Sequence, residues 1–189
     1  MMPRLLLEAP MTADGTEPWT TSEERSRAAT FRNERRRREY LTWRALLRRE
    51  LGCPGLRIDY DALGAPMLPD GEACISVSHC DGRVAVLIAP CRCAVDIEPA
   101  VRDFSRVADR YMTPSERELS ADPLWPGYVW CAKEALYKYA GCSGLDFRDD
   151  LRIVAVDPAA GFIMGRIADG DPLTLSASCR DGFLVVTLL

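Results

Sequence analysis

The sequence has few of the residues that common catalytic and metal sites require. It contains one histidine, His79, and no G-x-S-x-G motif, so a Ser-His-Asp hydrolase is poorly supported. The eight cysteines form no C-x-x-C pair, which favours scattered reduced thiols over a zinc centre or a disulfide scaffold. No apolar run approaches the roughly 20 residues of a membrane span, and the N-terminal apolar run is too short for a signal peptide. We therefore expect a soluble, cytoplasmic protein.

The charge of the chain argues against nucleic-acid binding. The formal net charge is -4, which gives no overall nucleic-acid signature. Arginine is nevertheless concentrated between Arg25 and Arg49, with four in succession at 35–38. Such a run is usually a solvated helix face or a nucleic-acid patch. Nucleic acid is the weaker choice because the run has no interleaved aromatic residues and no RNA motif, and the whole chain is acidic. Binding of a multiply phosphorylated small molecule remains open.

Two segments of the chain recur in the same order. "ISVSHCDGRVAVLIA" (75–89) aligns without gaps on "LSASCRDGFLVVTLL" (175–189), and "RALLRRELGCPGL" (44–56) aligns on "KEALYKYAGCSGL" (133–145). Two matches in one order favour an internal duplication. We predict an α+β fold of two related halves, 1–93 and 94–189, that form a pseudo-dimer. In each half a long helix packs on a small antiparallel sheet.

Local patterns predict the elements of these halves. Ser22 with acids after it predicts a helix start, and the basic segment forms a helix up to Gly52. Residues 75–89 form a hairpin around an Asp-Gly turn, and 93–99 a short strand. Helical material is expected over 102–112 and, most clearly, over 128–140, where Gly141 ends it. Strands are expected at 151–156, 161–167 and 173–189.

The short strand "CAVDIEP" carries two acids on one face. Side chains alternate along a strand, so Asp96 and Glu98 point one way while Val95 and Ile97 point the other. Their Cα atoms lie about 6.6 Å apart, close enough for both carboxylates to converge on a hard cation. By itself this pair is more typical of solvated acids at a strand end.

The helix "YVWCAKEALYKYAG" offers partners for those acids. Trp130, Glu134 and Lys138 follow at intervals of four, opposite the apolar stripe, with Lys133 beside them. They form either a stabilising surface pair or a third acidic ligand flanked by cations for phosphate. His79, next to Ser78, is either a structural hydrogen-bonding residue or a phosphate contact.

Together, "SVSHCDG", "CAVDIEP" and "WCAKEALYK" resemble the signatures of the 4'-phosphopantetheinyl transferase superfamily, in particular the larger, surfactin-type class. The resemblance extends from the Arg-rich helix to about Val156. It implies a pseudo-dimer that binds coenzyme A and Mg²⁺ between its halves. It also implies an enzyme of the holo-[acyl-carrier-protein] synthase type, which transfers phosphopantetheine from coenzyme A to a serine of an apo acyl or peptidyl carrier protein and releases 3',5'-ADP.

The resemblance also assigns roles to residues. Asp96, Glu98 and Glu134 would hold Mg²⁺, with Glu134 as the base and Asp96 and Lys138 completing the catalytic set. The residues expected to bind coenzyme A are Ser78, His79, Lys133, Lys138 and one of Arg37 and Arg38. A pseudo-dimer supplies its own cleft, so we expect a monomer that binds neither nucleic acid nor membrane.

The sequence departs from the family pattern at two places. Gly64-Ala65-Pro66 stands where Gly-Lys-Pro is frequent, and Ala94 stands where Gly commonly precedes V-D-I-E. The missing lysine supports one alternative, a non-catalytic relative that binds coenzyme A or a carrier protein. A second alternative is another Mg²⁺-dependent enzyme that cleaves pyrophosphate bonds. The carrier and its pathway are not specified by these residues.

Overall fold

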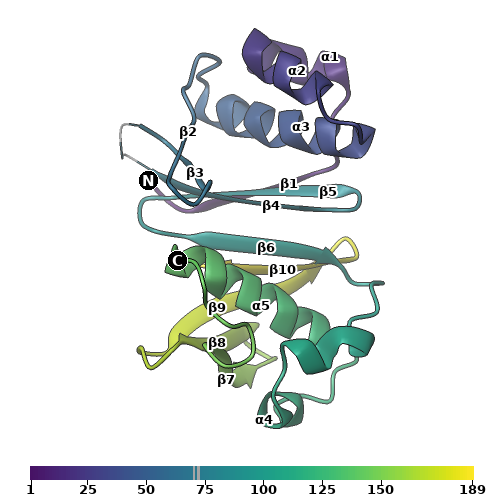
Figure 1. Cartoon of the computed structure of the whole chain (residues 1–189), viewed down its shortest axis with the longest axis vertical. Coiled ribbons are helices and arrows are strands. Elements are labelled where there is room, and N and C mark those ends of the chain that lie inside the picture. Colours follow the sequence, from purple (N-terminus) through teal and green to yellow (C-terminus); the bar gives the residue numbers. More distant parts are fainter. Residues whose placement is uncertain (70, 72) are drawn as a thin grey trace.

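The computed structural model describes residues 1–69, 71 and 73–189 and shows two α+β halves stacked through their sheets (Figure 1). The first half contains β1 (Arg4–Glu8), α1 (Ala13–Thr16), the 3-10 helix η1 (Glu17–Trp19), α2 (Ser22–Ala29), α3 (Glu34–Leu51), β2 (Asp59–Tyr60), β3 (Pro66–Met67), β4 (Cys74–Cys80) and β5 (Arg83–Ala89). The second half contains β6 (Ala94–Pro99), the 3-10 helix η2 (Ser105–Arg110), α4 (Pro114–Glu118), α5 (Trp125–Ala140), β7 (Leu151–Asp157), β8 (Phe162–Ile167), β9 (Leu173–Arg180) and β10 (Phe183–Leu188).

The two halves repeat one strand order. The first sheet runs β1-β5-β4, and the second runs β6-β10-β9 and continues with β8 and β7. β5 pairs antiparallel with β1 as β10 does with β6, and α3 and α5 both end at a left-handed glycine, Gly52 (φ 64°) and Gly141 (φ 59°). The predicted α+β fold of two related halves is confirmed. The boundary between residues 93 and 94 stays a prediction.

A shared apolar core joins the two halves. β4 and β6 lie side by side where the sheets meet, and α1 to α3 lie on the outer side of the first sheet (Figure 1). Alternate residues of β5 face opposite cores, because side chains alternate along a strand. The core between the halves contains Ala85, Leu87, Ala89, Cys93, Val95, Ile97 and Val185. On β6, Val95 and Ile97 therefore face the first half and leave the alternate positions for α5.

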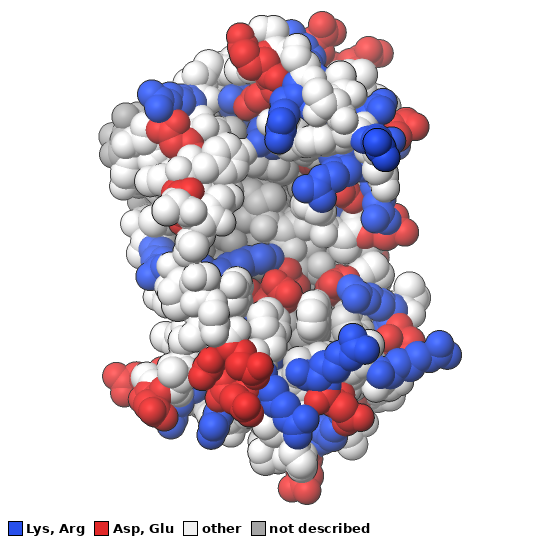
Figure 2. Space-filling model, viewed as in Figure 1, with Lys and Arg blue, Asp and Glu red and all other residues white. Residues whose placement is uncertain are grey.

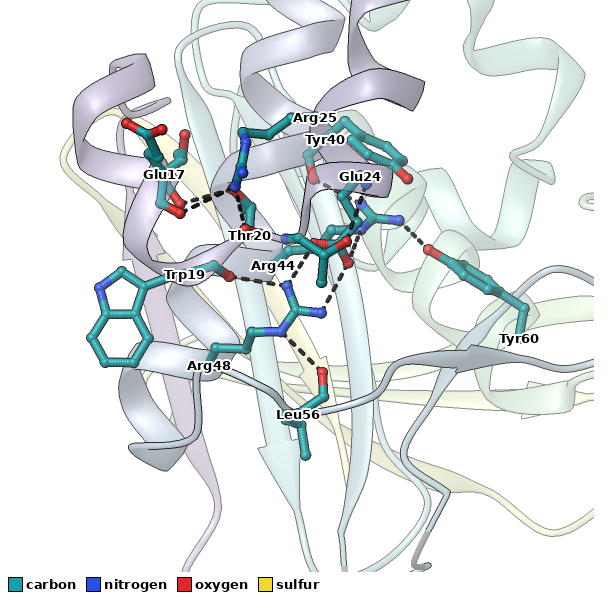
Figure 3. Close-up of polar contacts among 12 residues, drawn as sticks. Glu17, Trp19, Thr20, Glu24, Arg25, Tyr40, Arg44, Arg48, Leu56 and Tyr60 are labelled. Carbon is teal, nitrogen blue, oxygen red and sulfur yellow. Dashed lines mark hydrogen bonds and ion pairs between the residues drawn. The ribbon is translucent and has the colours of Figure 1, made fainter.

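A buried ion-pair network fixes α3 in the first half (Figure 3). The guanidinium of Arg48 donates to both carboxylate oxygens of Glu24, at 2.6 and 2.9 Å, and to the carbonyl of Leu56 at 2.9 Å. Arg44 lies 3.3 Å from the same carboxylate and donates to the hydroxyl of Tyr60. The network connects α2, α3 and β2. It thus holds in place the helix whose N-terminal turns carry the arginine run.

Several short elements differ from the sequence prediction, and α1, η1 and β3 were not predicted. The strand β1 (Arg4–Glu8) was not predicted, because its short apolar run becomes a strand only through pairing with the distant β5. The helical segment expected over 102–112 is shorter, a 3-10 helix at Ser105–Arg110. None of the helices in the described part of the chain is long and apolar enough to cross a membrane.

Candidate functional site

Asp96 is hydrogen-bonded to side chains from both halves of the protein. Its side chain is almost fully buried, and Oδ1 accepts hydrogen bonds from the Ser78 hydroxyl at 2.8 Å and from Lys138 Nζ at 2.7 Å. Lys138 also donates to the Val95 carbonyl at 2.9 Å, which holds α5 against β6. Oδ2 of Asp96 is buried and has no hydrogen-bond partner among the described residues. A buried carboxylate oxygen without a partner is costly, and this suits it to an incoming cation.

Glu98 follows Asp96 on the same side of β6. Its Oε1 accepts a hydrogen bond of 2.6 Å from Arg102 and one of 3.2 Å from the indole of Trp130. Burial raises the pKa of Glu98, and the charge of Asp96 adds to this rise, although the contacts with Arg102 and Trp130 act in the opposite direction. In this structure Glu98 thus already has a cation of its own chain as a partner.

Glu134 reaches the same region from α5. Burial raises the pKa of its carboxyl, and the negative charges of Asp96 and Glu98 add to the rise, while Lys138 opposes it. Residues four apart on a helix share a face, so Trp130, Glu134 and Lys138 all point from α5 toward β6. From the sequence, this face of α5 could equally have been exposed to solvent. In the structure it is the face that contributes to the site.

The acidic side chains agree with Mg²⁺ in kind. Mg²⁺ prefers one or two carboxylates together with substrate phosphates and water, and Asp96, Glu98 and Glu134 supply carboxylate oxygens only. The partnerless Oδ2 of Asp96 is an observation in favour of a cation. As they lie, no three His, Cys, Asp or Glu side chains among residues 1–69, 71 and 73–189 are gathered as a metal-ligand set.

A pocket of about 260 Å³ lies in the first half, at the end of β4, the strand that also carries Ser78. Its lining residues come from the start of α3 and from the β4–β5 turn: Asn33, Arg35, Arg36, Glu39, His79, Cys80 and Asp81. Figure 2 shows cationic and acidic side chains close together near the hollow between the halves. Burial is the main cause that lowers the pKa of His79, and the charge of Lys138 also lowers it, so the pocket and the acidic site lie within electrostatic reach of each other.

The structure shows Arg37 and Arg38 in contact with backbone carbonyls, and their assignment to a phosphate stays a prediction. Arg37 Nε donates to the Phe31 carbonyl at 2.6 Å, and Arg38 donates to carbonyls of the chain before α1, at 2.5 Å to Pro10 and 3.2 Å to Met11. Neither residue lines the pocket. Successive residues of a helix are rotated by about 100°, so four adjacent arginines point in different directions. Of the four, only Arg35 and Arg36 line the pocket.

Lys133 is also not available to a cofactor. Its side chain is 0 % exposed, and Nζ lies 2.8 Å from Glu116 and donates to the carbonyls of Tyr111 (2.5 Å) and Phe147 (2.9 Å). These contacts satisfy all three ammonium protons. The predicted role in binding coenzyme A is therefore wrong, and Lys133 instead fixes α5 against α4 and the loop before β7.

Ser78 lies at the site, where its hydroxyl contacts Asp96, and its binding of coenzyme A stays a prediction. Its hydroxyl is buried and donates its proton to Asp96, so it orients a carboxylate. His79 lies at the pocket with its side chain 43 % exposed, as a phosphate contact requires.

Glu39 was not predicted as a residue near the site, and Arg35 and Arg36 were considered only as members of the arginine run 35–38. The i,i+4 spacing of Arg35 and Glu39 predicts a helical ion pair, which the structure places at 3.5 Å. The spacing therefore indicated that Arg35 and Glu39 lie on the same face of the helix. Contact of that face with His79 depends on the packing of α3 over β4, which local sequence does not encode.

The fold and these contacts define a two-half protein with an acidic and cationic site along the strands where its halves meet. Residues 23–89 match the sequence model of the 4'-phosphopantetheinyl transferase N-terminal domain, and residues 92–178 match that of the 4'-phosphopantetheinyl transferase superfamily. The chain belongs to the 4'-phosphopantetheinyl transferase superfamily. Matches in both halves are consistent with the pseudo-dimeric class, and the family acts on carrier proteins with coenzyme A as co-substrate. A search of curated proteins gave no match.

Proposed function

We propose that this protein transfers 4'-phosphopantetheine from coenzyme A to a serine of an apo acyl or peptidyl carrier protein and releases 3',5'-ADP. The observation that carries the proposal is the cluster at Asp96, which is held by Ser78 of one half and Lys138 of the other. A group bound at this cluster contacts both halves, as the family's arrangement requires. The matches of both halves to this family support the same conclusion.

The reaction forms a bond between the carrier serine oxygen and the β-phosphorus of coenzyme A. The bond from that phosphorus to the bridging oxygen breaks, and the electron pair leaves with 3',5'-ADP. Glu134 accepts the serine proton, directly or through water, because it is a carboxylate that α5 directs toward the acidic residues of β6. Lys138 is part-exposed, so its remaining proton is free to contact a phosphate oxygen.

Mg²⁺ is the cofactor we propose, held by Asp96, Glu98 and Glu134. When bound, it would neutralise negative charge that develops on the pyrophosphate. Ser78 and Lys138 keep Asp96 oriented for that role. Glu98 would exchange its contact with Arg102 for the metal.

We assign the phosphate-bearing nucleotide end of coenzyme A to the pocket beside His79. Arg35 and Arg36 line it, and they replace Arg37 and Arg38 as the candidates for the 3'-phosphate. Guanidinium groups suit this ligand because they donate two parallel hydrogen bonds to a phosphate. The frequent lysine of the family is Ala65 here, so these arginines supply cationic contact in its place.

Mass spectrometry tests the transfer. The protein is incubated with coenzyme A, Mg²⁺ and a panel of apo carriers from fatty acid, polyketide and peptide synthesis. A carrier that gains one phosphopantetheine mass, with 3',5'-ADP released in equal amount, supports the proposal. Nucleotide release without a carrier would instead indicate a pyrophosphate-cleaving enzyme. Coenzyme A binding with no transfer to any carrier would indicate the non-catalytic relative.

A further inference from the structure

The only histidine of the chain contacts a buried acid that no motif singles out. His79 Nδ1 lies 3.2 Å from Oε2 of Glu39, whose side chain is 6 % exposed. Arg35 compensates the same carboxylate at 3.5 Å from Oε1. Glu39 is therefore a carboxylate held in place on α3, and its negative charge favours the imidazole proton at Nδ1, the ring nitrogen next to it. The His79 side chain has no other polar partner among the described residues, so Nε2 is the nitrogen left for the pocket.

Burial and the neighbouring charges together set the protonation state of His79 in the free protein. Burial lowers the pKa of the imidazole below its ordinary value, and Lys138, Arg36 and Arg35 lower it further, while Glu39 alone raises it. The imidazole is therefore neutral near pH 7 when the pocket is empty. With its proton on Nδ1, a neutral ring presents only a lone pair at Nε2.

A lone pair at Nε2 cannot donate a hydrogen bond to a phosphate oxygen. It must first take a proton, and a phosphate in the pocket favours this because its negative charge offsets the cations of the lining. We propose that Glu39 is a positioning residue that holds Nδ1–H of His79, so that Nε2 takes up one proton from solvent when a phosphate group of coenzyme A enters the pocket. The inference rests on the proposed function, and no covalent bond changes in this step.

The single histidine allows a direct test by ¹⁵N NMR without assignment of other residues. In the metal-free protein we expect the neutral ring to carry its proton on Nδ1. Glu39→Gln keeps an acceptor but removes the charge, so the pKa of His79 falls by about one pH unit and the preference for Nδ1–H weakens. Glu34→Gln, on the same helix but exposed, is the matched control and leaves the pKa unchanged. An Nε2–H tautomer in the wild type, or equal pKa values in wild type and Glu39→Gln, would overturn the inference.

Calorimetry with coenzyme A then tests the proton uptake. At pH 7.5, titrations in two buffers of different ionisation enthalpy give the protons bound per coenzyme A. We expect uptake by the wild type and by Glu34→Gln. For Glu39→Gln we expect a reduced uptake and an affinity weaker by up to about tenfold, which is the change for one pKa unit. In turnover, KM rises in Glu39→Gln while kcat changes little, because His79 lies away from the reacting phosphorus.

The outcomes separate the two proposals. If coenzyme A binds the wild type without proton uptake, the role of Glu39 and His79 is refuted while the transferase function stands. If coenzyme A does not bind the wild type at all, the proposed function is refuted, and the uptake with it.

Discussion

The Ser78 hydroxyl on β4 donates a 2.8 Å hydrogen bond to Oδ1 of Asp96 on β6, and this contact joins the chemistry of the two halves. A second serine of β4 makes a similar contact that does not reach the site. Ser76 Oγ accepts a 3.0 Å hydrogen bond from the backbone nitrogen of Val95. Both serines are equally buried. The Ser76 contact can therefore serve as a structural control for the Ser78 contact on the same strand.

Ser78→Ala and Ser76→Ala are expected to cost similar stability but to differ in activity. Each loses one buried hydrogen bond, worth about 1 kcal/mol of unfolding free energy. Only Ser78→Ala removes one of the two hydrogen-bond donors of Asp96, so we expect kcat to fall by about five- to tenfold in this variant alone. Urea unfolding and the rate of carrier modification measure the two effects. Equal losses of kcat in both variants would show that the Ser78 contact is only structural.

Local sequence was sufficient for most of the longer helices and strands and for part of the site. The alternation of "CAVDIEP" predicts which side Asp96 and Glu98 face, and the interval of four predicts that Glu134 and Lys138 share a face. The structure shows both arrangements on β6 and α5. Lys133 could not be separated from this set by sequence, because only the packing of α4 shows that its ammonium group is enclosed.

The arginine run shows a second limit. Four adjacent arginines are distributed around all sides of a helix, because a turn contains 3.6 residues. Whichever side faces a ligand therefore has an arginine, and the run itself does not indicate which one. The choice among them depends on the tertiary position of His79 and of the chain before α1, which lie far from the run in sequence.

Arg36→Gln is expected to reduce the preference for coenzyme A over 3'-dephospho-coenzyme A. A charge-assisted hydrogen bond to phosphate is worth about 1.5 to 3 kcal/mol, so affinity for coenzyme A falls by about tenfold or more while that for the dephospho form is unchanged. Arg37→Gln, whose arginine contacts the Phe31 carbonyl, serves as the control and keeps the preference. Calorimetric titration of both ligands measures it. Loss of the preference in Arg37→Gln instead would restore the original assignment.

Lys133→Met is expected to destabilise the fold without weakening coenzyme A binding. The substitution leaves Glu116 buried without its cation, and loss of one partner of a buried pair costs about 3 to 5 kcal/mol. Adding Glu116→Gln removes the unpaired charge and restores part of the loss. Chemical unfolding measures both variants, and titration below the unfolding transition gives their affinity. A folded Lys133→Met protein that binds coenzyme A tenfold more weakly would contradict the structural role.

Arg102→Gln is expected to strengthen the binding of divalent cations. Arg102 lies 2.6 Å from Glu98 and is 48 % exposed, so it competes for a carboxylate that the metal needs. Its removal leaves Glu98 available, and Mn²⁺ binding measured by electron paramagnetic resonance tightens severalfold. Arg106→Gln, which removes an exposed cation paired with Asp103, is the control. Unchanged Mn²⁺ affinity in Arg102→Gln would exclude competition for Glu98.

Glu24→Gln is expected to destabilise the protein at pH 7 by an amount that becomes smaller as the pH falls toward 3. Burial alone would raise the pKa of Glu24, but hydrogen bonds and charges from Arg48 and Arg44 hold it below the ordinary 4.5. Below pH 4.5 the unfolded chain binds a proton that the folded chain does not, so this contribution to stability is complete above 4.5 and is lost as the pH falls through the folded pKa. At pH 7 the variant leaves two buried guanidinium groups without their carboxylate, at a cost of about 3 to 5 kcal/mol.

The measurement is the difference in unfolding free energy between wild type and Glu24→Gln from pH 7 to pH 3. Other carboxylates titrate in the same range, but they do so in both proteins, and their contribution cancels in the difference. Glu23→Gln, an exposed neighbour in the first turn of α2, is the control and should stay within about 0.5 kcal/mol of wild type at pH 7. A Glu24→Gln difference that does not shrink as the pH falls would mean that the network stabilises α3 through packing and hydrogen bonds, and not through the charge of Glu24.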